Sequence, residues 1–285
     1  MVVTWRLAKP EDVPSIERFL RQHIQSSMFP LANLRDFGLN GPDPRSVRMW
    51  LLGDDLRAIF TITNEGMILP QCPDCSDVEL EAVIALIAEH PTIGVIGDAA
   101  QCRRILRLAG WQDRPANLNK DEPAFSLDLN DLILPELADA WLVPLAEIDR
   151  ALAEQWRSAY LIETPGLILD EVAKQAAHDI DAYLARDSHR ALLVRGQPVG
   201  MTGFNAALPD IVQIGGVYTP TELRGRGYAR TAVALHLQEA QAAGVSRAVL
   251  FAASNSAARA YISIGFVPAG QFALILFKTE KETVA

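Results

Sequence analysis

The sequence predicts an α/β fold made of two related domains. A length of 285 residues matches two domains of ordinary size. A strand, a glycine loop and a helix follow one another over residues 211–243, which is the order of an α/β unit. Residues 95–111 can also be aligned with residues 250–266 at a constant offset of 155. A repeat that keeps the order of strand and helix indicates a duplicated α/β unit rather than a solenoid of short repeats.

The duplication continues upstream of this segment. A strand at 4–7 and a helix from about 11 to 23 have counterparts in a strand at 140–143 and a helix from about 146 to 160, at an offset of 136. A strand at 125–129 then leads into the connection. We therefore expect domains at 1–132 and 133–285.

The second half contains the most regular elements. Residues 191–194 and 199–204 flank the turn Arg195-Gly196-Gln197-Pro198 and predict a hairpin. The next strand, at 211–217, has to end before Pro220, which lacks the N–H that a ladder needs. From Ala229 apolar residues recur at helical spacing until Gly244, which is suited to the left-handed position after a helix.

The loop between this strand and this helix has the composition of a phosphate site. The first N–H groups of a helix have no partner inside it and carry the positive end of the helix dipole. Gly225 and Gly227 keep side chains away from an anion there, and Arg224, Arg226 and Arg230 add positive charge. No Gly-Lys-Ser/Thr follows, so the loop is not a P-loop. An ordinary solvated turn is the alternative for the loop taken alone.

Two motifs together resemble the GNAT family of N-acetyltransferases. That family carries Arg/Gln-x-x-Gly-x-Gly/Ala after a strand that ends in Val-x-x-Pro, and here Val217 and Pro220 precede Arg224, Gly227 and Ala229. The segment 247–266 resembles the family's second acetyl-CoA motif, with a buried strand, Ser254-Asn255-Ser256, a helix carrying Tyr261, and Gly265-Phe266. The resemblance covers residues 211–277.

This resemblance implies a tandem GNAT fold. Each domain is then a mixed, mostly antiparallel sheet with a splayed parallel strand pair and flanking helices. Gly215-Gly216 would form the bulge that separates the pair, and close packing against another backbone is the alternative.

The resemblance also implies acetyl-CoA as co-substrate, with direct transfer of the acetyl group to an amine. The residues at cofactor-binding positions are Val217, Tyr218, Thr219, Leu223, Arg224, Gly225, Arg226, Gly227, Tyr228, Ala229, Ser254 and Asn255. The backbone N–H of Val217 would hold the oxyanion, and the backbone of Thr219 would pair with the pantetheine arm. The family's Asn stands seven residues before its tyrosine, whereas Asn255 stands six before Tyr261 and Ser254 stands seven before it. Either of them could meet the cofactor.

Tyr261 is the candidate catalytic residue. Its phenol would protonate the departing thiolate as the C–S bond breaks. The alternative is an aromatic that only packs the helix on the sheet. No base is identified: Glu163 is a candidate, a capping or solvated glutamate is the commoner case, and a water chain could serve instead. His178 and His236 are assigned no role.

The first copy lacks these groups. Leu106 stands at the position of Tyr261, Ala100 at that of Asn255, and the arginine-glycine loop has no counterpart near 70–80. We expect a degenerate, non-catalytic domain, and a separate ligand-binding module is the alternative. Cys72-Pro73-Asp74-Cys75 has the spacing of half a zinc site or of a redox pair, but no second pair follows. A turn with two thiols, and no metal, is the favoured interpretation.

Composition narrows the function classes further. A net charge of −9, with 49% hydrophobic and 21% charged residues, argues against a nucleic-acid or anionic membrane partner. No apolar run reaches the ~18 residues of a membrane span, and the N-terminus does not resemble a signal peptide, so we expect a cytoplasmic protein. The leading hypothesis is an N-acetyltransferase acting on a small-molecule or peptide amine. The alternative is a non-catalytic acyl-CoA-binding regulator or sensor. The oligomeric state is unknown.

Overall fold

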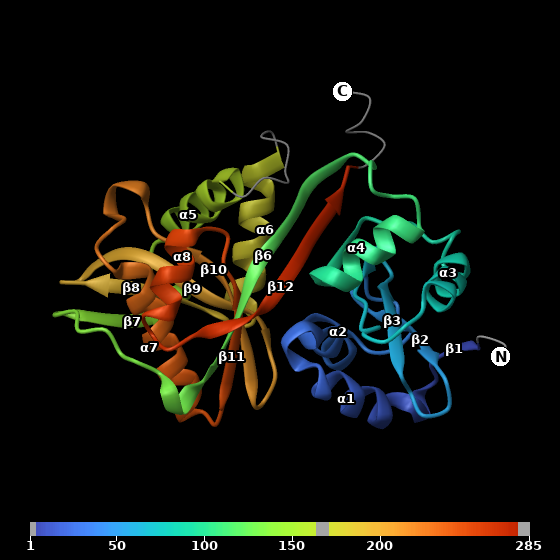
Figure 1. Ribbon diagram of the computed structural model, residues 1–285. Helices are drawn as coiled ribbons and strands as arrows, with labels where there is room; N and C mark the ends of the chain where they lie inside the picture. The colour runs from blue at the N-terminus through green and yellow to red at the C-terminus, as the bar shows by residue number, and fades with distance from the viewer. Residues whose placement is uncertain (1–3, 164–170, 279–285) are drawn as a thin grey trace. The chain divides into compact units, whose positions relative to one another are not determined.

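The computed structural model describes residues 4–163 and 171–278 and contains two compact units (Figure 1). The first comprises Met1–Glu122 together with Gly270–Ala285, and the second comprises Pro123–Ala269. Each unit has one sheet with helices packed on it.

The described strands of the first unit follow the order β1-β2-β3-β4-β5-β12. They are β1 (Trp5–Leu7), β2 (Val47–Leu52), β3 (Ala58–Thr63), β4 (Met67–Ile68), β5 (Gly94–Asp98) and β12 (Val267–Phe277). The helices are α1 (Val13–Gln22), α2 (Ile24–Phe37), α3 (Asp77–Leu86) and α4 (Ala99–Leu108), with the 3₁₀ turn η1 (Pro10–Asp12). Only the β4–β5 pair is parallel among these strands.

The described strands of the second unit follow the order β7-β8-β9-β10-β11-β6. They are β7 (Ala140–Pro144), β8 (His189–Val194), β9 (Gln197–Ala207), β10 (Ile211–Tyr218), β11 (Arg247–Phe251) and β6 (Ala116–Asp128). The helices are α5 (Arg150–Glu163), α6 (Val172–Ala185), α7 (Tyr228–Ala242) and α8 (Asn255–Ile262), with 3₁₀ turns η2 (Leu129–Asp131), η3 (Leu145–Glu147) and η5 (Thr221–Leu223). The parallel pair here is β10–β11.

The two units share one topology. Two helices follow the first strand, one helix joins the two parallel strands, and one helix follows the fifth strand in each unit. The predicted α/β fold of two tandem domains is therefore confirmed. The repeat also holds in detail, because Gly110 and Gly265 both take positive φ after helices α4 and α8.

The sixth strand of each sheet comes from the opposite part of the sequence. β6 follows the first unit's β5 and α4 in the chain, but its residues Ala124–Asp128 pair with β11 of the second unit. β12 lies near the end of the sequence, but its residues Phe272–Leu276 pair with β5 of the first unit. The units therefore differ from the ranges 1–132 and 133–285 expected from the sequence. An alternating sequence pattern predicts which residues form a strand, but it does not predict the strand with which they pair.

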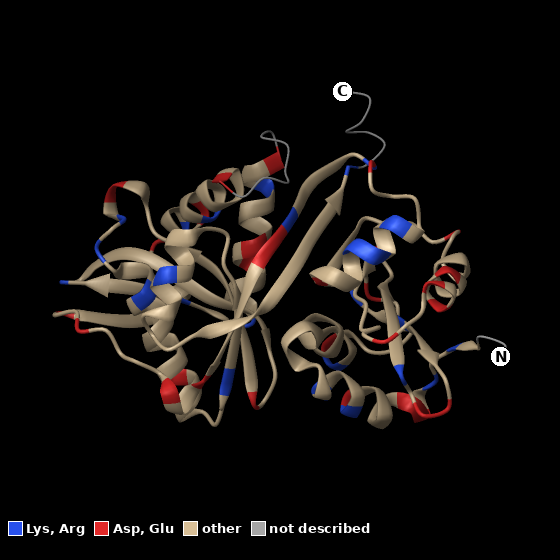
Figure 2. Ribbon diagram, viewed as in Figure 1, with Lys and Arg blue, Asp and Glu red and all other residues tan. Residues whose placement is uncertain are grey.

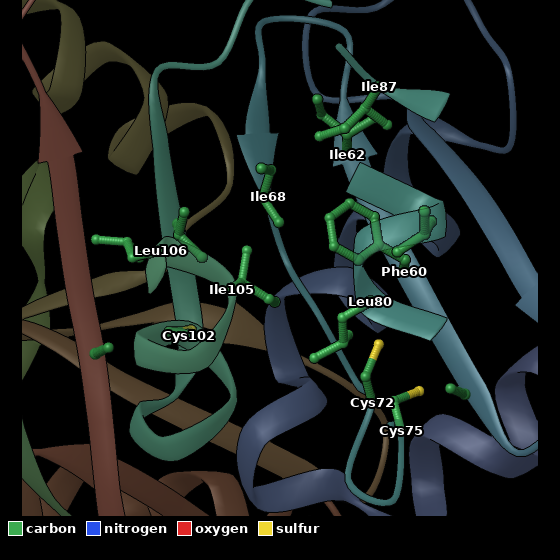
Figure 3. Close-up of a cluster of buried hydrophobic side chains, with 14 of the residues drawn as sticks. Phe60, Ile62, Ile68, Cys72, Cys75, Leu80, Ile87, Cys102, Ile105 and Leu106 are labelled. Carbon is green, nitrogen blue, oxygen red and sulfur yellow. The ribbon is translucent and has the colours of Figure 1, made fainter. Parts of the chain in front are cut away.

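Alternating side chains place helices on both faces of the second sheet. Ala191 of β8 packs in a cluster with Trp156 of α5 and Ile180 of α6, whereas the adjacent Leu192 packs with Ala232 of α7. Successive strand residues point to opposite faces, so α5 and α6 cover one face and α7 covers the other. In the first unit the cluster drawn in Figure 3 joins β2, β3, β4, β5 and β12 to α3 and α4.

Candidate cofactor and active site

Strand β10 carries an irregularity at its two glycines. Its register with β9 shifts between Gly215 and Tyr218, and Gly216 has a φ of +62°. The predicted bulge is therefore confirmed. Side chains of neighbouring strands fill the space that a Cβ would need, Asn205 beside Gly215 and the ring of His189 beside Gly216. Glycine is required here by conformation at Gly216 and by close approach at both positions.

The parallel pair β10–β11 separates beside this bulge. The two strands are in register from Ile211↔Arg247 to Gln213↔Val249. Beyond that point β10 continues to Tyr218 and β11 continues to Phe251 without further pairing between them in the described chain. The predicted splayed pair is therefore present. Past Gln213, backbone groups of β10 that face away from β9 have no partner on β11 in the described chain, although the Ile214 carbonyl accepts from Gln213 Nε2 at 2.9 Å. The remaining groups can pair with a ligand that enters between the strands.

The loop after β10 leads directly into the N-terminus of α7. Gly225 and Gly227 have φ of +78° and +82°, and Gly227 is the residue that precedes the helix. The Thr231 N–H donates to the Gly227 carbonyl at 3.1 Å, so the amides of the first three helical residues lie before the first intrahelical bond. No side chain caps this end of α7 among the described residues. The exposed amides form a cradle suited to an anion.

The corresponding helix of the first unit is capped by its own residues. Ser76 precedes α3, and its Oγ accepts a hydrogen bond from the Glu79 N–H at 3.3 Å. The Glu79 carboxylate in turn accepts from the Ser76 N–H at 2.7 Å, and this backbone hydrogen bond is the main cause of the lowered pKa of Glu79. A carboxylate therefore occupies the helix end in α3, where α7 offers bare backbone.

The three loop arginines differ in their surroundings. Arg224 donates from Nε to the Thr219 carbonyl at 2.9 Å and from Nη2 to both carboxylate oxygens of Glu163 at 2.7 Å. The Arg230 guanidinium packs against Gly227, because a Cβ at that glycine would lie 3.2 Å from Arg230 Nε. Arg226 is exposed and donates to the Glu222 carbonyl at 3.4 Å. Arg226 and Arg230 thus flank the cradle, while Arg224 ties the end of β10 to α5.

The apolar residues of the predicted cofactor set are positioned by packing. Tyr218 is buried with Trp156 and Met201, and burial is the main cause of its raised pKa. Leu223 and Tyr228 are half-buried against a cluster of β8, β9 and α7. The Tyr218 side chain is therefore held inside the protein, whereas those of Leu223 and Tyr228 keep part of their surface exposed.

The two candidates at the start of α8 have different surroundings. Ser254 is the N-cap, and its Oγ accepts from the Ala257 N–H at 3.2 Å. Asn255 is the first helical residue and is exposed. In the first unit the N-cap of α4 is Asp98, so the caps differ by 156 positions, whereas the glycines that follow the helices, Gly110 and Gly265, differ by 155. The N-cap is therefore one residue closer to Tyr261 in the second unit than it is to the equivalent Leu106 in the first.

Tyr261 lies on the inner side of α8. Its side chain is 7% exposed, and its ring meets Phe266 edge-on at 6.1 Å between centroids. It belongs to the apolar cluster of the second unit, as Leu106 belongs to that of the first. The structure therefore places a phenol where the first copy has an aliphatic side chain.

The histidines lie in contrasting places. His178 is exposed on α6. His236 is buried and stacks on Phe204 at 3.8 Å, and burial lowers its pKa to about 3. Neither contacts the cradle through any described bond.

His189, which no sequence pattern singles out, is also buried in the second unit. It stacks on Tyr183 at 3.5 Å, its Nδ1 lies 2.9 Å from Ser188 Oγ, and its Nε2 has no hydrogen-bond partner within the described residues. Burial holds its pKa well below the usual value. The ring reaches the bulge only because Gly203 faces it across the sheet. That juxtaposition depends on strand register, for which the sequence carries no local signal.

Charge distribution, metal ligands, membrane-spanning helices and cysteines bear on the expectations from the sequence. Acidic and basic residues are interspersed along the elements of each unit (Figure 2). Within residues 4–163 and 171–278 there is no cluster of three or more potential metal ligands, and no helix there has the length and apolar character needed to cross a bilayer. All three cysteines are free thiols.

Comparison with solved structures supports the fold. A GCN5-related N-acetyltransferase from Kribbella flavida has a TM-score of 0.59 at 14% identity, covering 92% of this chain and 97% of that one. A GCN5-related N-acetyltransferase from Sphaerobacter thermophilus has a TM-score of 0.56 at 17% identity, covering 96% and 94%. A tandem GNAT protein from the clavulanic acid biosynthesis pathway has a TM-score of 0.56 at 11% identity, covering 98% and 100%.

Comparison at the sequence level gives a family match for part of the chain. No curated protein matches the chain. The family model for the acetyltransferase (GNAT) family matches residues 145–266, which include the bulge, the cradle and both acetyl-CoA motifs. Residues 145–266 therefore resemble the GNAT acetyltransferase family.

Proposed function

We propose that this protein is an N-acetyltransferase that moves an acetyl group from acetyl-CoA directly to an amine of a small molecule or peptide. The observation that carries the proposal is the uncapped N-terminus of α7 behind two left-handed glycines, at the end of a strand that has separated from its parallel neighbour. The second unit is then the catalytic one. A cytoplasmic location remains a prediction from the sequence.

The cradle suits the diphosphate of coenzyme A. A Cβ at Gly225 would meet nothing within 4 Å, so the loop leaves open space on that side. Backbone amides from Gly225 to Ala229 would hold the phosphate oxygens, and Arg226 and Arg230 would contribute charge. The Leu223 and Arg224 amides are outside this set, because they donate to the Pro220 and Thr221 carbonyls. Arg224 would act differently from the sequence expectation, by fixing the strand end through Thr219 and Glu163.

The gap between β10 and β11 suits the thioester arm. Gly216 and Val217 fall within the irregular register of β10, so the Val217 N–H is the proposed donor to the oxyanion. The Thr219 backbone would pair with the pantetheine arm. Of the two α8 candidates we favour Asn255 as the side-chain contact, because the Ser254 oxygen already accepts the capping bond.

The chemistry requires one attack and two proton movements. The neutral amine nitrogen forms a bond to the acetyl carbon, and the C–S bond then breaks with its electron pair moving to sulfur. Tyr261 is proposed to supply the proton that neutralises the thiolate. The amine loses its proton to a base, for which the Glu163 carboxylate and a chain of water molecules are the two candidates. Arg224 Nη2 donates to both Glu163 oxygens, so this carboxylate is already engaged, which favours the water chain.

The first unit is proposed to be a degenerate, non-catalytic copy. Its helix α3 is closed by the Ser76–Glu79 capping box, and Leu106 replaces the tyrosine. It would support or orient the catalytic unit rather than bind acetyl-CoA.

Two measurements on the full chain test the function. Calorimetric titration with acetyl-CoA and with coenzyme A is expected to give one site per chain. Release of free thiol from acetyl-CoA is then followed with a panel of small amines and peptide N-termini, and at least one acceptor is expected to raise the rate above that of hydrolysis. Absence of binding would reject the acetyl-CoA assignment. Binding without thiol release for any amine would favour a regulatory sensor instead.

A further inference from the structure

The loop between β4 and α3 in the first unit contains a close pair of cysteines. In the shared topology this loop has the place of the arginine-glycine loop between β10 and α7. Pro73 and Asp74 form a turn, with Cys72 and Cys75 at its two ends. The ends of such a turn lie within about 7 Å, which is the Cα separation over which a disulfide can close.

The two thiols are neighbours within the buried cluster. Figure 3 shows the Cys72 and Cys75 side chains beside each other, with Cys102 on another element. The Cys72 thiol donates to the Ile59 carbonyl oxygen at 3.4 Å. The Cys72 N–H donates to Gln101 Oε1 at 2.6 Å, which fixes this end of the turn.

The two thiols differ in depth and in charge environment. Cys75 lies between the exposed residues Asp74 and Ser76, so it is one layer beneath the surface. Its pKa is lowered by the neighbouring Cys72 and by the charges of Arg57 and Arg104, against burial and the charge of Glu79. The Arg104 guanidinium also donates to the Cys75 carbonyl, so this charge is held in place.

Cys72 is the opposite case, because burial raises its pKa well above the usual value. Cys75 lies nearer the surface and beside the Arg104 guanidinium, so it corresponds to the attacking member of a dithiol pair, and the inner Cys72 corresponds to the resolving member. Cys102, on α4, has a pKa raised by burial.

We propose that Cys72 and Cys75 form a reversible dithiol–disulfide site that reacts with low-molecular-weight disulfides. The Cys75 thiolate attacks one sulfur of the small disulfide, forms a mixed disulfide and releases one thiolate. Cys72 then loses its proton and attacks the Cys75 sulfur, which forms the Cys72–Cys75 bond and releases the second thiolate. The protein pair is oxidised by two electrons, the small disulfide is reduced to two thiols, and the protons end on the released thiols.

The same residues do not make a structural zinc site. Such a site takes four ligands from the protein, whereas the described residues supply two thiols here and no third ligand in a cluster with them. The proposal is also independent of acetyl transfer, because it concerns only residues of the first unit.

Oxidation of the native full chain tests the proposal. The protein is incubated with oxidised glutathione, remaining thiols are blocked, and peptides are mapped by mass spectrometry. We expect a Cys72–Cys75 disulfide that dithiothreitol reverses, with Cys102 still alkylated as a thiol. Cys72→Ser should accumulate a glutathione adduct at Cys75, and Cys102→Ser, the matched control, should oxidise like the parent. A bond that forms only in denaturant, or that joins Cys102, would overturn the proposal.

A second experiment tests the charge environment without removing a cysteine. The rate of alkylation of Cys75 by iodoacetamide is measured across pH in the parent, in Arg57→Met and in Arg103→Met. Arg103 pairs with Asp121 on another side of α4 and serves as the control. We expect Arg57→Met to slow alkylation several-fold near neutral pH and to shift the profile upward, with Arg103→Met unchanged. Equal rates in all three proteins would contradict the assignment of Cys75 as the attacking thiol.

Discussion

Tyr261 and Leu106 occupy equivalent positions in the two units but differ in chemistry. Both are buried on the inner side of a short helix, and a backbone hydrogen bond joins each to the aromatic residue five positions later. The packing role of the position is therefore common to both units. The added hydroxyl of Tyr261 is what the proposed proton transfer needs.

Replacing Tyr261 by Phe is expected to slow acetyl transfer by roughly 10² or more while leaving acetyl-CoA affinity unchanged, because a general acid acts on the leaving group only in the transition state. Turnover is measured by thiol release and affinity by calorimetry. Tyr183→Phe, which removes a hydroxyl from another buried tyrosine of the same unit, is the matched control. Turnover that is the same in both variants would remove the catalytic role.

His236 makes the stability of the protein depend on pH. Its pKa is about 3 in the folded protein and ~6.5 in an unfolded chain, so only the unfolded state binds a proton between these values. The contribution is complete above about pH 6.5 and is lost as the pH falls, at about 1.4 kcal/mol per pH unit. Urea unfolding should therefore show that the parent loses about 2 kcal/mol more than His236→Phe between about pH 7.5 and about pH 5. Parallel losses in the two proteins would contradict this prediction.

For single residues, the sequence pattern predicted where glycine is needed better than it predicted which side chains contact one another. The glycines at 215, 216, 225 and 227 are where the backbone needs them, because each need is local. The pairing of Arg224 with Glu163 and the contact of His189 with the bulge join residues on different elements. Such contacts follow from tertiary packing, so the pattern along the chain does not contain them.

The element that the function depends on most is the connection from β10 to α7. Both glycines of the loop have positive φ, which costs a side-chain-bearing residue roughly 1 kcal/mol. A stability loss alone is therefore not informative about ligand binding. The useful comparison is between two glycines that share conformation and open space but differ in place.

Gly225 and Gly244 provide that comparison. Both have positive φ, and a Cβ at either would meet nothing within 4 Å, but Gly225 lies in the cradle and Gly244 follows the far end of α7. Gly225→Ala is expected to weaken acetyl-CoA binding at least ~10-fold, whereas Gly244→Ala should bind like the parent after a similar loss of stability. Calorimetry and thermal unfolding measure the two quantities. Equal affinities would place the diphosphate elsewhere.

Elements with local signals were predicted closely. The strand expected at 211–217 is Ile211–Tyr218, and the helix expected from Ala229 begins at Tyr228. The strand expected at 125–129 is instead the last part of β6, which begins at Ala116. Its first half, Ala116–Glu122, lies in the first unit and its second half in the second. A polar stretch that includes Asn119 to Glu122 gave no strand pattern, so its extension was missed.

For the whole molecule, the exchange of β6 and β12 means that neither sheet is built from one continuous half of the sequence. Phe272, Ala273, Ile275 and Phe277 of β12 are all buried in the first unit. Burial of each large side chain contributes roughly 1.5–3 kcal/mol, and the total is comparable to the ~5–15 kcal/mol that stabilises a typical domain.

A chain that ends at Ala269 is therefore expected to lose the fold of the first unit. Hydrogen exchange should show unprotected amides in β5, Gly94–Asp98, because β12 is its antiparallel partner, while β11 of the second unit keeps its protection. A chain that ends at Lys278 keeps β12 whole and is the control. Protected β5 amides in the shorter chain would show that the first unit does not need its exchanged strand.

The same exchange determines when each half can mature during synthesis. As the polypeptide leaves the ribosome, β5 emerges long before β12, so the N-terminal sheet cannot complete itself while the remainder is being translated. The edge of β5 has to stay unpaired until β12 has left the ribosome, and unpaired strand edges favour association between nascent chains. The C-terminal sheet has no such delay, because β6 is synthesised before its partner β11. The C-terminal sheet is therefore expected to be completed before the N-terminal sheet.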